Sequence, residues 1–310
     1  MRLPALLEVV QERFPWEDVA RGAGQILAER LPELSSEIAT LDPKVFGLSS
    51  GFFYLPAALA LEWGRDDDAS LGRLLRLLAI GHGHFAFQDL VIDDGGASPQ
   101  LCLLSDTFLL TYLDQLADEA PDDDPGRYRR WHDRYYGWYA SALQVELGHR
   151  ARLHRFSPAE ILKLGMKAAP GNTTIHLIAD WTGQEESAVG AVTSVMQLCA
   201  GLQVLDDVND LSEDFAGGNY SMPLTEIILS LGPDSSSECL QPDDLLAVAA
   251  DSGVFANCLD ISESLFSLAA CTAASVGANV ISELAATWGR RVDMRRDLLF
   301  KALLTGATEE

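Results

Sequence analysis

The spacing of apolar residues is the feature that most limits what this chain can fold into. Apolar side chains recur every three or four residues along most of its length, as in the segments 71–92, 103–117 and 191–211. This spacing matches the α-helical turn, whereas the alternation with period two that is typical of strands is rare. We therefore predict one all-α domain over residues 1–310, with about ten or more helices.

Breaks between the predicted helices fall at clusters of polar residues, glycine and proline. We expect turns at 64–70 and 118–126, an interruption of a helix at 170–172, and the longest loop at 232–244. No period of about 20–50 residues is visible, so a solenoid is not expected.

Charge and composition exclude several classes of protein. Lys and Arg number 22 against 46 Asp and Glu, a net charge of −24, so the chain should repel phosphate backbones and we expect no nucleic-acid partner. A hydrophobic share of 48% excludes a mostly disordered chain. The 5 cysteines form no CxxC pair, which fits a reducing, cytoplasmic location better than a zinc module or a disulfide scaffold.

Two segments bear on membranes. The N-terminal apolar run is interrupted by Glu8, Glu12 and Arg13, so it does not have the pattern of a secretory signal. The uncharged stretch Ser264–Ser282 is about long enough to cross a bilayer, but it is rich in Ser, Thr and Ala. We expect a buried or subunit-facing helix there, and no stable membrane insertion.

The sharpest local pattern is a set of aspartates after a long apolar run. On one helix, with about 100° per residue, Asp206, Asp207, Asp210 and Asp214 fall on one stripe. Carboxylates that lie so close repel one another, and oxygen ligands without Cys or His favour Mg²⁺. The alternative is a solvated acidic face, as we expect for the runs 66–68 and 122–124.

A second acidic set, Asp89, Asp93 and Asp94, also ends a long apolar helix. If the two sets faced each other across a cavity, they could hold several Mg²⁺ ions, and those ions could hold a diphosphate.

Four blocks of the sequence resemble the trans-isoprenyl diphosphate synthase superfamily, the class I isoprenoid synthases. They are FQDLVIDD (87–94), LLSDTFLLTYLDQL (103–116), the segment 157–183 and LQVLDDVNDLSEDFAGGNYSMPL (202–224). The order and spacing of the blocks are similar to those of the family. The fourth block is the most specific and the first is the weakest.

The resemblance implies a bundle of about a dozen helices around a deep cavity, with both aspartate sets at its mouth. It implies three Mg²⁺ ions, a prenyl diphosphate substrate, a homodimer, and catalytic roles for Asp89, Asp93, Asp206 and Asp207. The implied metal ligands are Asp89, Asp93, Asp94, Asp206, Asp207, Asp210 and Asp214; Lys167, Gln203 and Thr173 would bind diphosphate, and Gln144 and Thr174 would line the substrate pocket.

Several departures from the family pattern concern the second substrate, isopentenyl diphosphate. Family members that elongate chains bind it through basic residues before and after the first motif; here 43–64 holds only Lys44, and 95–101 holds no cation. Gln88 stands where a leading Asp is expected, and Asn219 replaces a lysine. We therefore expect a class I terpene cyclase that ionises a C20 or C15 prenyl diphosphate and closes rings.

A cyclase must exclude water and stabilise a carbocation, which aromatic faces do well. Phe53, Phe85 and Phe87 are candidates for the pocket, with ordinary core packing as the alternative. For the basic residues of 290–296 we consider two roles, closing over the diphosphate and forming a solvated helix end. Two other functions stay open: a prenyltransferase with an unusual acceptor, and a catalytically silent partner subunit.

Overall fold

Helices dominate the chain, as the apolar spacing predicts. The computed structural model describes residues 2–32, 53–94, 99–150, 152–232, 240–241 and 244–305, and the side chains of 89–94, 100–101 and 298–305 lie outside this description. Within the described residues every regular element is a helix and none is a strand. The prediction of an all-α fold is confirmed.

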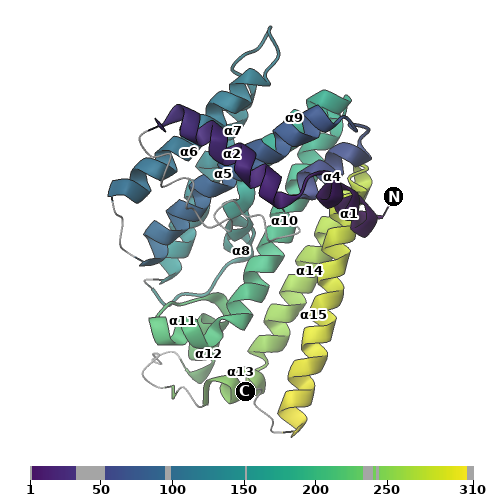
Figure 1. Cartoon of the computed structure of the whole chain (residues 1–310). Coiled ribbons are helices and arrows are strands. Elements are labelled where there is room, and N and C mark those ends of the chain that lie inside the picture. The colour runs from purple at the N-terminus through teal and green to yellow at the C-terminus, as the bar shows by residue number, and fades with distance from the viewer. Residues whose placement is uncertain are drawn as a thin grey trace. The chain divides into compact units, whose positions relative to one another are not determined.

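Figure 1 labels the helices along the chain. The first part of the chain forms α1 (Leu3–Arg13), α2 (Trp16–Arg30), α4 (Leu55–Glu62), α5 (Asp68–Asp94), α6 (Pro99–Asp118) and α7 (Arg127–Arg150). The middle forms α8 (Pro158–Leu164), the 3₁₀ helix η3 (Gly165–Asn172), α9 (Thr173–Thr182), α10 (Glu185–Asn209), α11 (Leu211–Gly217) and α12 (Met222–Leu231). The last part forms α13 (Leu245–Asp251), α14 (Val254–Ser275) and α15 (Asn279–Thr305).

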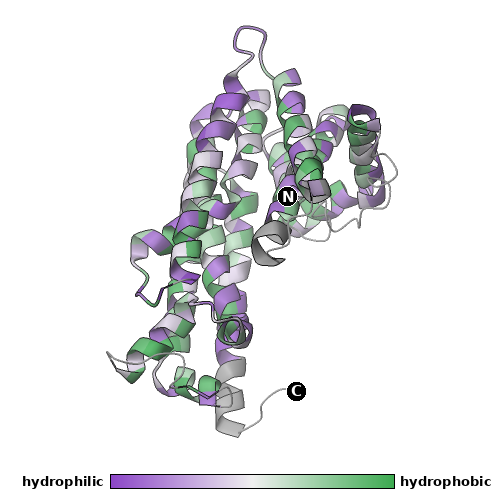
Figure 2. Ribbon diagram, turned by 90° about the vertical axis from the view of Figure 1, so that its left-hand side faces the viewer, coloured by the Kyte–Doolittle hydropathy of each residue, from purple (hydrophilic) through white to green (hydrophobic). Residues whose placement is uncertain are grey.

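The chain divides into two compact units, each made of separate stretches of sequence. The first contains residues 1–134, 171–189 and 278–280, and the second contains 135–170, 190–277 and 281–310. The single domain expected over 1–310 stays a prediction. Each unit has its own apolar core. Figure 2 shows hydrophobic and hydrophilic residues interspersed along individual helices, as expected when one side of a helix packs and the other is solvated.

Helix boundaries fall where the sequence places its breaks. α6 ends and α7 begins on either side of the polar turn at 118–126, and α5 starts inside the predicted turn at 64–70. Residues 170–172, where an interruption of a helix is predicted, form the end of the 3₁₀ helix η3, which contains Pro170. α9 then ends at Gly183, whose φ of 67° is a conformation that glycine adopts without strain. The loop expected at 232–244 lies mostly outside the described residues.

The uncharged stretch Ser264–Ser282 is not one helix. α14 ends at Ser275, the backbone turns at Gly277 with φ of 73°, and α15 begins at Asn279. Two described helices, α10 and α14, are long and apolar enough to cross a bilayer by length and composition, and about half of the most apolar window of each is buried within the structure.

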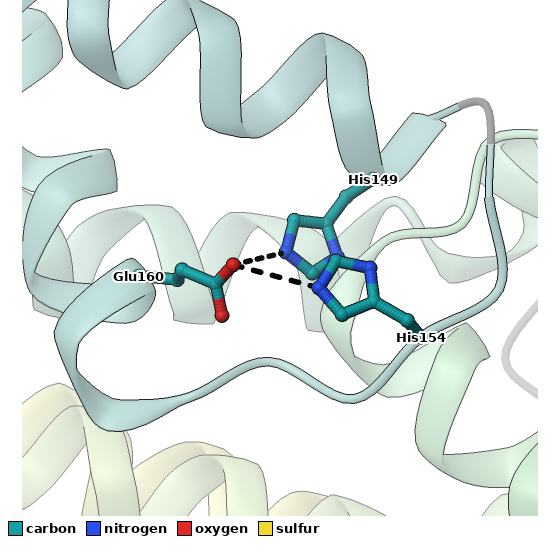
Figure 3. A group of neighbouring side chains, drawn as sticks. All are labelled: His149, His154 and Glu160. Carbon is teal, nitrogen blue, oxygen red and sulfur yellow. Dashed lines mark ion pairs between the residues drawn. The ribbon is translucent and has the colours of Figure 1, made fainter.

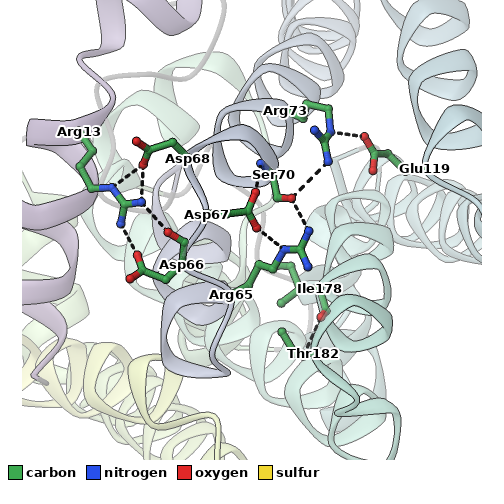
Figure 4. A network of polar contacts seen from close by, with 10 residues as sticks. All are labelled: Arg13, Arg65, Asp66, Asp67, Asp68, Ser70, Arg73, Glu119, Ile178 and Thr182. Carbon is green, nitrogen blue, oxygen red and sulfur yellow. Dashed lines mark hydrogen bonds and ion pairs between the residues drawn. The ribbon is translucent and has the colours of Figure 1, made fainter.

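The acidic run at 66–68 lies on the surface, as predicted, and it binds arginines (Figure 4). Arg13 contacts both Asp66 and Asp68, and Arg65 Nε lies 2.6 Å from Asp67 Oδ2. These carboxylates join α1 to the start of α5, so their role in this unit is structural.

Candidate functional site

The second aspartate set spans a helix break. α10 ends at Asn209, Asp210 lies between the helices, and α11 begins at Leu211, so the prediction of one continuous helix is wrong. The hydrogen-bond pattern nevertheless continues across the break: Asp210 N donates to the Asp206 carbonyl (2.8 Å), and Asp214 N donates to the Asp210 carbonyl (2.9 Å). The four aspartates therefore stay close in space.

Asp207 is the most constrained of these residues. Gln203 Nε2 donates to its Oδ1 at 2.9 Å, and the backbone N–H of Met222, the first residue of α12, donates to its Oδ2 at 3.3 Å. Burial raises the pKa of Asp207 to about 7, and the negative charges of Asp214 and Glu146 add to the rise, against the two hydrogen bonds that lower it. Near neutral pH this carboxyl group therefore holds a proton part of the time.

The pKa values of the neighbouring carboxyl groups are shifted in the same direction. Burial raises the pKa of Asp206, as does the charge of Asp210, while Lys167 lowers it. Burial also raises the pKa of Asp214, which Ser221 and Arg150 partly oppose. Shifts in this direction mean that the charged forms lack sufficient positive charge around them.

Lys167 supplies the positive charge nearest to Gln203. Its Nζ lies 2.9 Å from Glu146 Oε2 and 3.5 Å from Gln203 Oε1. Since Gln203 donates with its other end to Asp207, one chain of contacts runs from Glu146 through Lys167 and Gln203 to Asp207. The structure thus brings together the lysine, the glutamine and the aspartates that the sequence singled out in its third and fourth blocks.

Two members of this group were missed by the sequence analysis. Glu146 on α7 binds Lys167 and also Arg150, whose Nη2 lies 2.8 Å from Glu146 Oε1. The pair Glu146–Arg150 has the i,i+4 spacing of an ordinary helix-surface ion pair, so nothing in the sequence distinguished it.

Local sequence explains how Lys167 reaches α10. A capping box at Ser157 and Glu160 begins α8, which runs directly into η3. At the junction stands Gly165, where a Cβ would lie 2.1 Å from the Met196 carbonyl and 2.7 Å from the Ala200 amide nitrogen of α10. Only glycine permits this approach, and it holds η3 and its lysine against α10.

The donor set suits a hard divalent cation. Against five carboxylates, those of Glu146 and the four aspartates, the cations named among the described residues here are two, Lys167 and Arg150. Carboxylate oxygens without Cys or His are the ligands that Mg²⁺ and Ca²⁺ prefer. A bound ion would supply the missing positive charge and would return the aspartate pKa values toward their ordinary range.

The first aspartate set cannot be placed at the same level of detail. Asp89, Asp93 and Asp94 form the end of α5, in the first unit, and their side chains lie outside the described residues. Their roles as ligands stay predictions.

Three other predicted residues occupy different surroundings. Thr173 and Thr174 begin α9 in the first unit and are fully buried, with Thr174 Oγ1 donating to the Gly171 carbonyl at 2.7 Å. Gln144 is exposed on α7, and, two residues from Glu146, it points to the other side of that helix. It lines an open hollow together with His149 and Lys163. Their roles in binding stay predictions.

The candidate aromatic residues mostly pack in the core of the first unit. Phe53 and Phe87 belong to that core, with Phe87 edge-on to Phe108 at 5.4 Å, and Phe85 is partly buried beside His84. These contacts are those of ordinary core packing.

The arginines near the C-terminus bind within their own helix pair. Arg296 on α15 contacts Asp260 and Glu263 of α14 at 2.8 and 2.9 Å, and Arg291 lies over the ring of Trp288. These contacts are typical of a solvated helix face.

Comparison with known proteins gives a uniform result. No protein-family model matches the chain, and no curated protein matches it in sequence. Solved structures do. A decaprenyl diphosphate synthase from Rhodobacter capsulatus superposes with a TM-score of 0.70 at 16% identity, over 94% of this chain and 99% of that one. A polyprenyl synthase from Caulobacter crescentus, complexed with calcium and isoprenyl diphosphate, gives 0.65 at 17% identity, over 90% and 96%. A geranylgeranyl pyrophosphate synthetase from Geoglobus acetivorans gives 0.62 at 15% identity, over 92% and 97%.

The chain has the fold of the trans-isoprenyl diphosphate synthases. The resemblance found in four sequence blocks is thereby confirmed at the level of the fold, and it extends over nearly the whole chain. At these identities the likeness establishes the isoprenoid synthase fold, and the reaction must be argued from the site.

Proposed function

We propose that this protein is a divalent-metal-dependent enzyme that ionises an allylic prenyl diphosphate. The observation that carries the proposal is the chain of contacts Glu146–Lys167–Gln203–Asp207, set beside three further aspartates in an isoprenoid synthase fold. It joins a cation that can bind phosphate oxygens to a carboxylate group that can bind metal.

Each residue then has a chemical task. Asp206, Asp207 and Asp210 would hold the metal, with Asp214 close behind, and the resemblance implies three Mg²⁺ ions in all. When bound, Mg²⁺ neutralises the leaving diphosphate electrostatically. Lys167 would exchange its contact with Glu146 for a diphosphate oxygen, while Gln203 keeps Asp207 oriented. The calcium named with the Caulobacter crescentus structure supports the use of a divalent ion.

The fate of the allylic cation separates two reactions. The similar structures are named as prenyl diphosphate synthases, and they favour prenyl transfer, in which isopentenyl diphosphate attacks the cation and the chain lengthens. This reverses the order in which the sequence ranked the alternatives.

Cyclisation is the second candidate, and a specific observation favours it. Binding the diphosphate of a second substrate requires cations, yet 43–64 holds only Lys44 and 95–101 holds none. Residues 43–52, which include Lys44, and 95–98 lie outside the described residues, so the observation is one of sequence. A silent partner subunit is the least favoured function, because such a subunit needs no metal-binding carboxylate cluster.

The deciding experiment is a product assay. Purified protein with Mg²⁺ is given geranyl, farnesyl, geranylgeranyl or geranylfarnesyl diphosphate, each with and without isopentenyl diphosphate, and extracts are analysed by gas chromatography–mass spectrometry after phosphatase treatment. Longer linear chains that require isopentenyl diphosphate would establish prenyl transfer. A cyclic hydrocarbon or alcohol from one substrate alone would establish a cyclase.

Two variants test whether the activity depends on the aspartate set: Asp207→Ala within it and Asp123→Ala outside it. Asp207→Ala should lower turnover by about 10²–10³-fold, the usual cost of removing an electrostatic group from an active site. Asp123, in an exposed acidic turn, should be silent when changed. An unchanged Asp207→Ala enzyme, or no product from any substrate, would contradict the proposal.

A further inference from the structure

Two histidines and a glutamate meet at the junction of α7 and α8, apart from the aspartate set (Figure 3). His149 lies in the last turn of α7, His154 in the connection that follows, and Glu160 in the first turn of α8. One ligand atom from each lies within 4.8 Å of the others. All three residues belong to the second unit.

The two distances from the glutamate oxygen to the histidine nitrogens match the spacing of ligands around a metal ion. His149 Nε2 and His154 Nε2 lie 3.5 and 3.4 Å from the same oxygen, Glu160 Oε1. Such separations are long for hydrogen bonds, whose N···O distance is about 2.7–3.2 Å. In a tetrahedral zinc site with bonds of about 2.0–2.1 Å, neighbouring ligand atoms stand about 3.3–3.4 Å apart.

His149 is a buried polar group in need of a partner. It is 2% exposed, and neither ring nitrogen has a hydrogen-bond partner among the described residues. Its ring stacks between Phe156, at 3.5 Å, and His154, at 3.9 Å. A buried imidazole without hydrogen bonds is costly, and a metal ion bound at Nε2 would remove part of that cost.

Hydrogen bonds hold Glu160 with one carboxylate oxygen toward the two histidines. The Ser157 hydroxyl and the Ser157 N–H both donate to Glu160 Oε2, at 2.6 and 2.9 Å, which leaves Oε1 toward the histidines. These two hydrogen bonds, together with the nearby histidines, lower the pKa of Glu160 to about 2. The carboxylate is therefore ionised at all ordinary pH values, and a fixed outer hydrogen bond of this kind is typical of metal ligands.

We propose that His149, His154 and Glu160 form a second metal site, which binds a transition-metal ion, with Zn²⁺ as the best fit. Two imidazoles and one carboxylate are borderline ligands that suit Zn²⁺ and its neighbours in the periodic table, unlike the all-oxygen aspartate set. His149 is fixed between aromatic rings, and the half-exposed ring of His154, stacked on it, places its Nε2 3.4 Å from Glu160 Oε1.

The surroundings predict the fourth ligand. The three residues open onto a hollow of about 790 Å³, which Arg152 and Lys163 also line. These two cations would repel a bare dication, so they favour an ion whose fourth position carries an anion such as hydroxide or chloride. The ion would also join the end of α7, the helix that carries Glu146, to the start of α8, which runs directly into η3 and Lys167.

The test is a metal titration of the full chain, stripped of metal and held in excess Mg²⁺ so that oxygen-ligand sites are filled. Zn²⁺ affinity is measured by competition with a chromophoric chelator, and Co²⁺ serves as a spectroscopic probe of tetrahedral coordination. The wild type should bind one Zn²⁺ and should give the intense visible bands of tetrahedral Co²⁺.

His154→Ala should weaken Zn²⁺ binding by at least about 10-fold. Removing a residue that only hydrogen-bonds to a metal ligand already lowers metal affinity by about 10-fold or more, and His154 would be a ligand itself. Glu160→Gln should do the same, and it keeps the capping box, so folding is preserved. His82→Ala, which removes an exposed histidine of α5, is the matched control and should bind as wild type. Asp207→Asn should also keep the site. Binding that survives in both ligand variants, or that is lost in Asp207→Asn, would overturn the proposal.

Discussion

At the scale of single residues, the buried Asp207 makes the stability of the protein depend on pH. Its pKa is about 7 in the folded protein against an ordinary 3.8, so between these values the folded state holds the extra proton. The stabilisation is fully present below 3.8 and is lost as the pH rises through about 7. At pH 8 without metal, the protein carries a buried charge that destabilises it.

Asp207→Asn should therefore stabilise the metal-free protein in a pH-dependent way. With a chelator present, we expect its melting temperature to exceed that of wild type by roughly 2–4 °C at pH 8, the shift that about 1 kcal/mol produces in a large domain. At pH 5 the difference should be smaller than at pH 8, because folded wild-type Asp207 is then protonated and only the ionisation of the unfolded chain, with its ordinary pKa of 3.8, still favours unfolding of wild type. Calorimetry at both pH values checks this, and a difference that is the same at both would contradict it. When Mg²⁺ and diphosphate are both present at saturating concentration, wild type should have the higher melting temperature, since only wild type keeps the carboxylate that would bind the metal.

The sequence predicts part of this residue-level picture. The spacing of Gln203, Asp206 and Asp207 within α10 places them together because a helix fixes its own geometry. Glu146 and the N–H of Met222 join them only through the packing of other helices on α10, and no local spacing encodes such contacts. The same limit explains why His149, His154 and Glu160, spread over a helix, a connection and the next helix, did not stand out in the sequence.

At the scale of elements, the position of Lys167 depends on how closely η3 packs against α10. A side chain at Gly165 would collide with backbone atoms of α10, which cannot move as the end of a flexible side chain can. Gly165→Ala should therefore lower the melting temperature by several degrees and should weaken diphosphate binding, because the lysine moves with η3.

Gly137→Ala is the control for this change. Gly137 lies inside α7, and a Cβ there would meet no atom within 4 Å. Alanine should raise stability by about 0.5–1 kcal/mol, the usual difference between the two residues in a helix. Thermal denaturation and inorganic diphosphate binding, measured on both variants, would contradict the packing argument if they gave the same result.

Helix ends mark where sequence reasoning succeeds and fails. The Pro170 interruption and the turn between α6 and α7 were predictable, because proline and clustered polar residues act on the backbone locally. The break at Asp210 was not, because the periodicity of apolar residues continues through it. Asp and Asn are poor in helix interiors, and the run Asn209–Asp210 was the available signal.

At the scale of the whole molecule, the apolar period alone predicts an all-α protein, and the four blocks predict the fold shared with the polyprenyl synthases. The reaction is not encoded at that scale. Under the proposal, prenyl transfer and cyclisation would use the same aspartates and the same lysine, and they would differ in whether a second diphosphate finds cations nearby. The segments that decide this, 43–64 and 95–101, depart from the family pattern exactly where a second substrate would be recognised, so the sequence there bears on the reaction while the fold does not.

Net charge is the other property of the whole chain with a measurable consequence. The chain has 46 acidic and 22 basic residues, so the negative charges of the folded state repel one another. Exposed ion pairs such as Arg13–Asp66 act in the opposite direction, because their charges attract. Each such pair contributes only about 0–1 kcal/mol, so repulsion should outweigh attraction.

Raising NaCl from about 10 to about 150 mM shortens the screening length from about 30 to about 8 Å and should raise the melting temperature. MgCl₂ at equal ionic strength should raise it further in wild type but not in Asp207→Ala, because only an intact carboxylate cluster binds the ion. A melting temperature that falls with NaCl would mean that the surface ion pairs, rather than the excess negative charge, control stability.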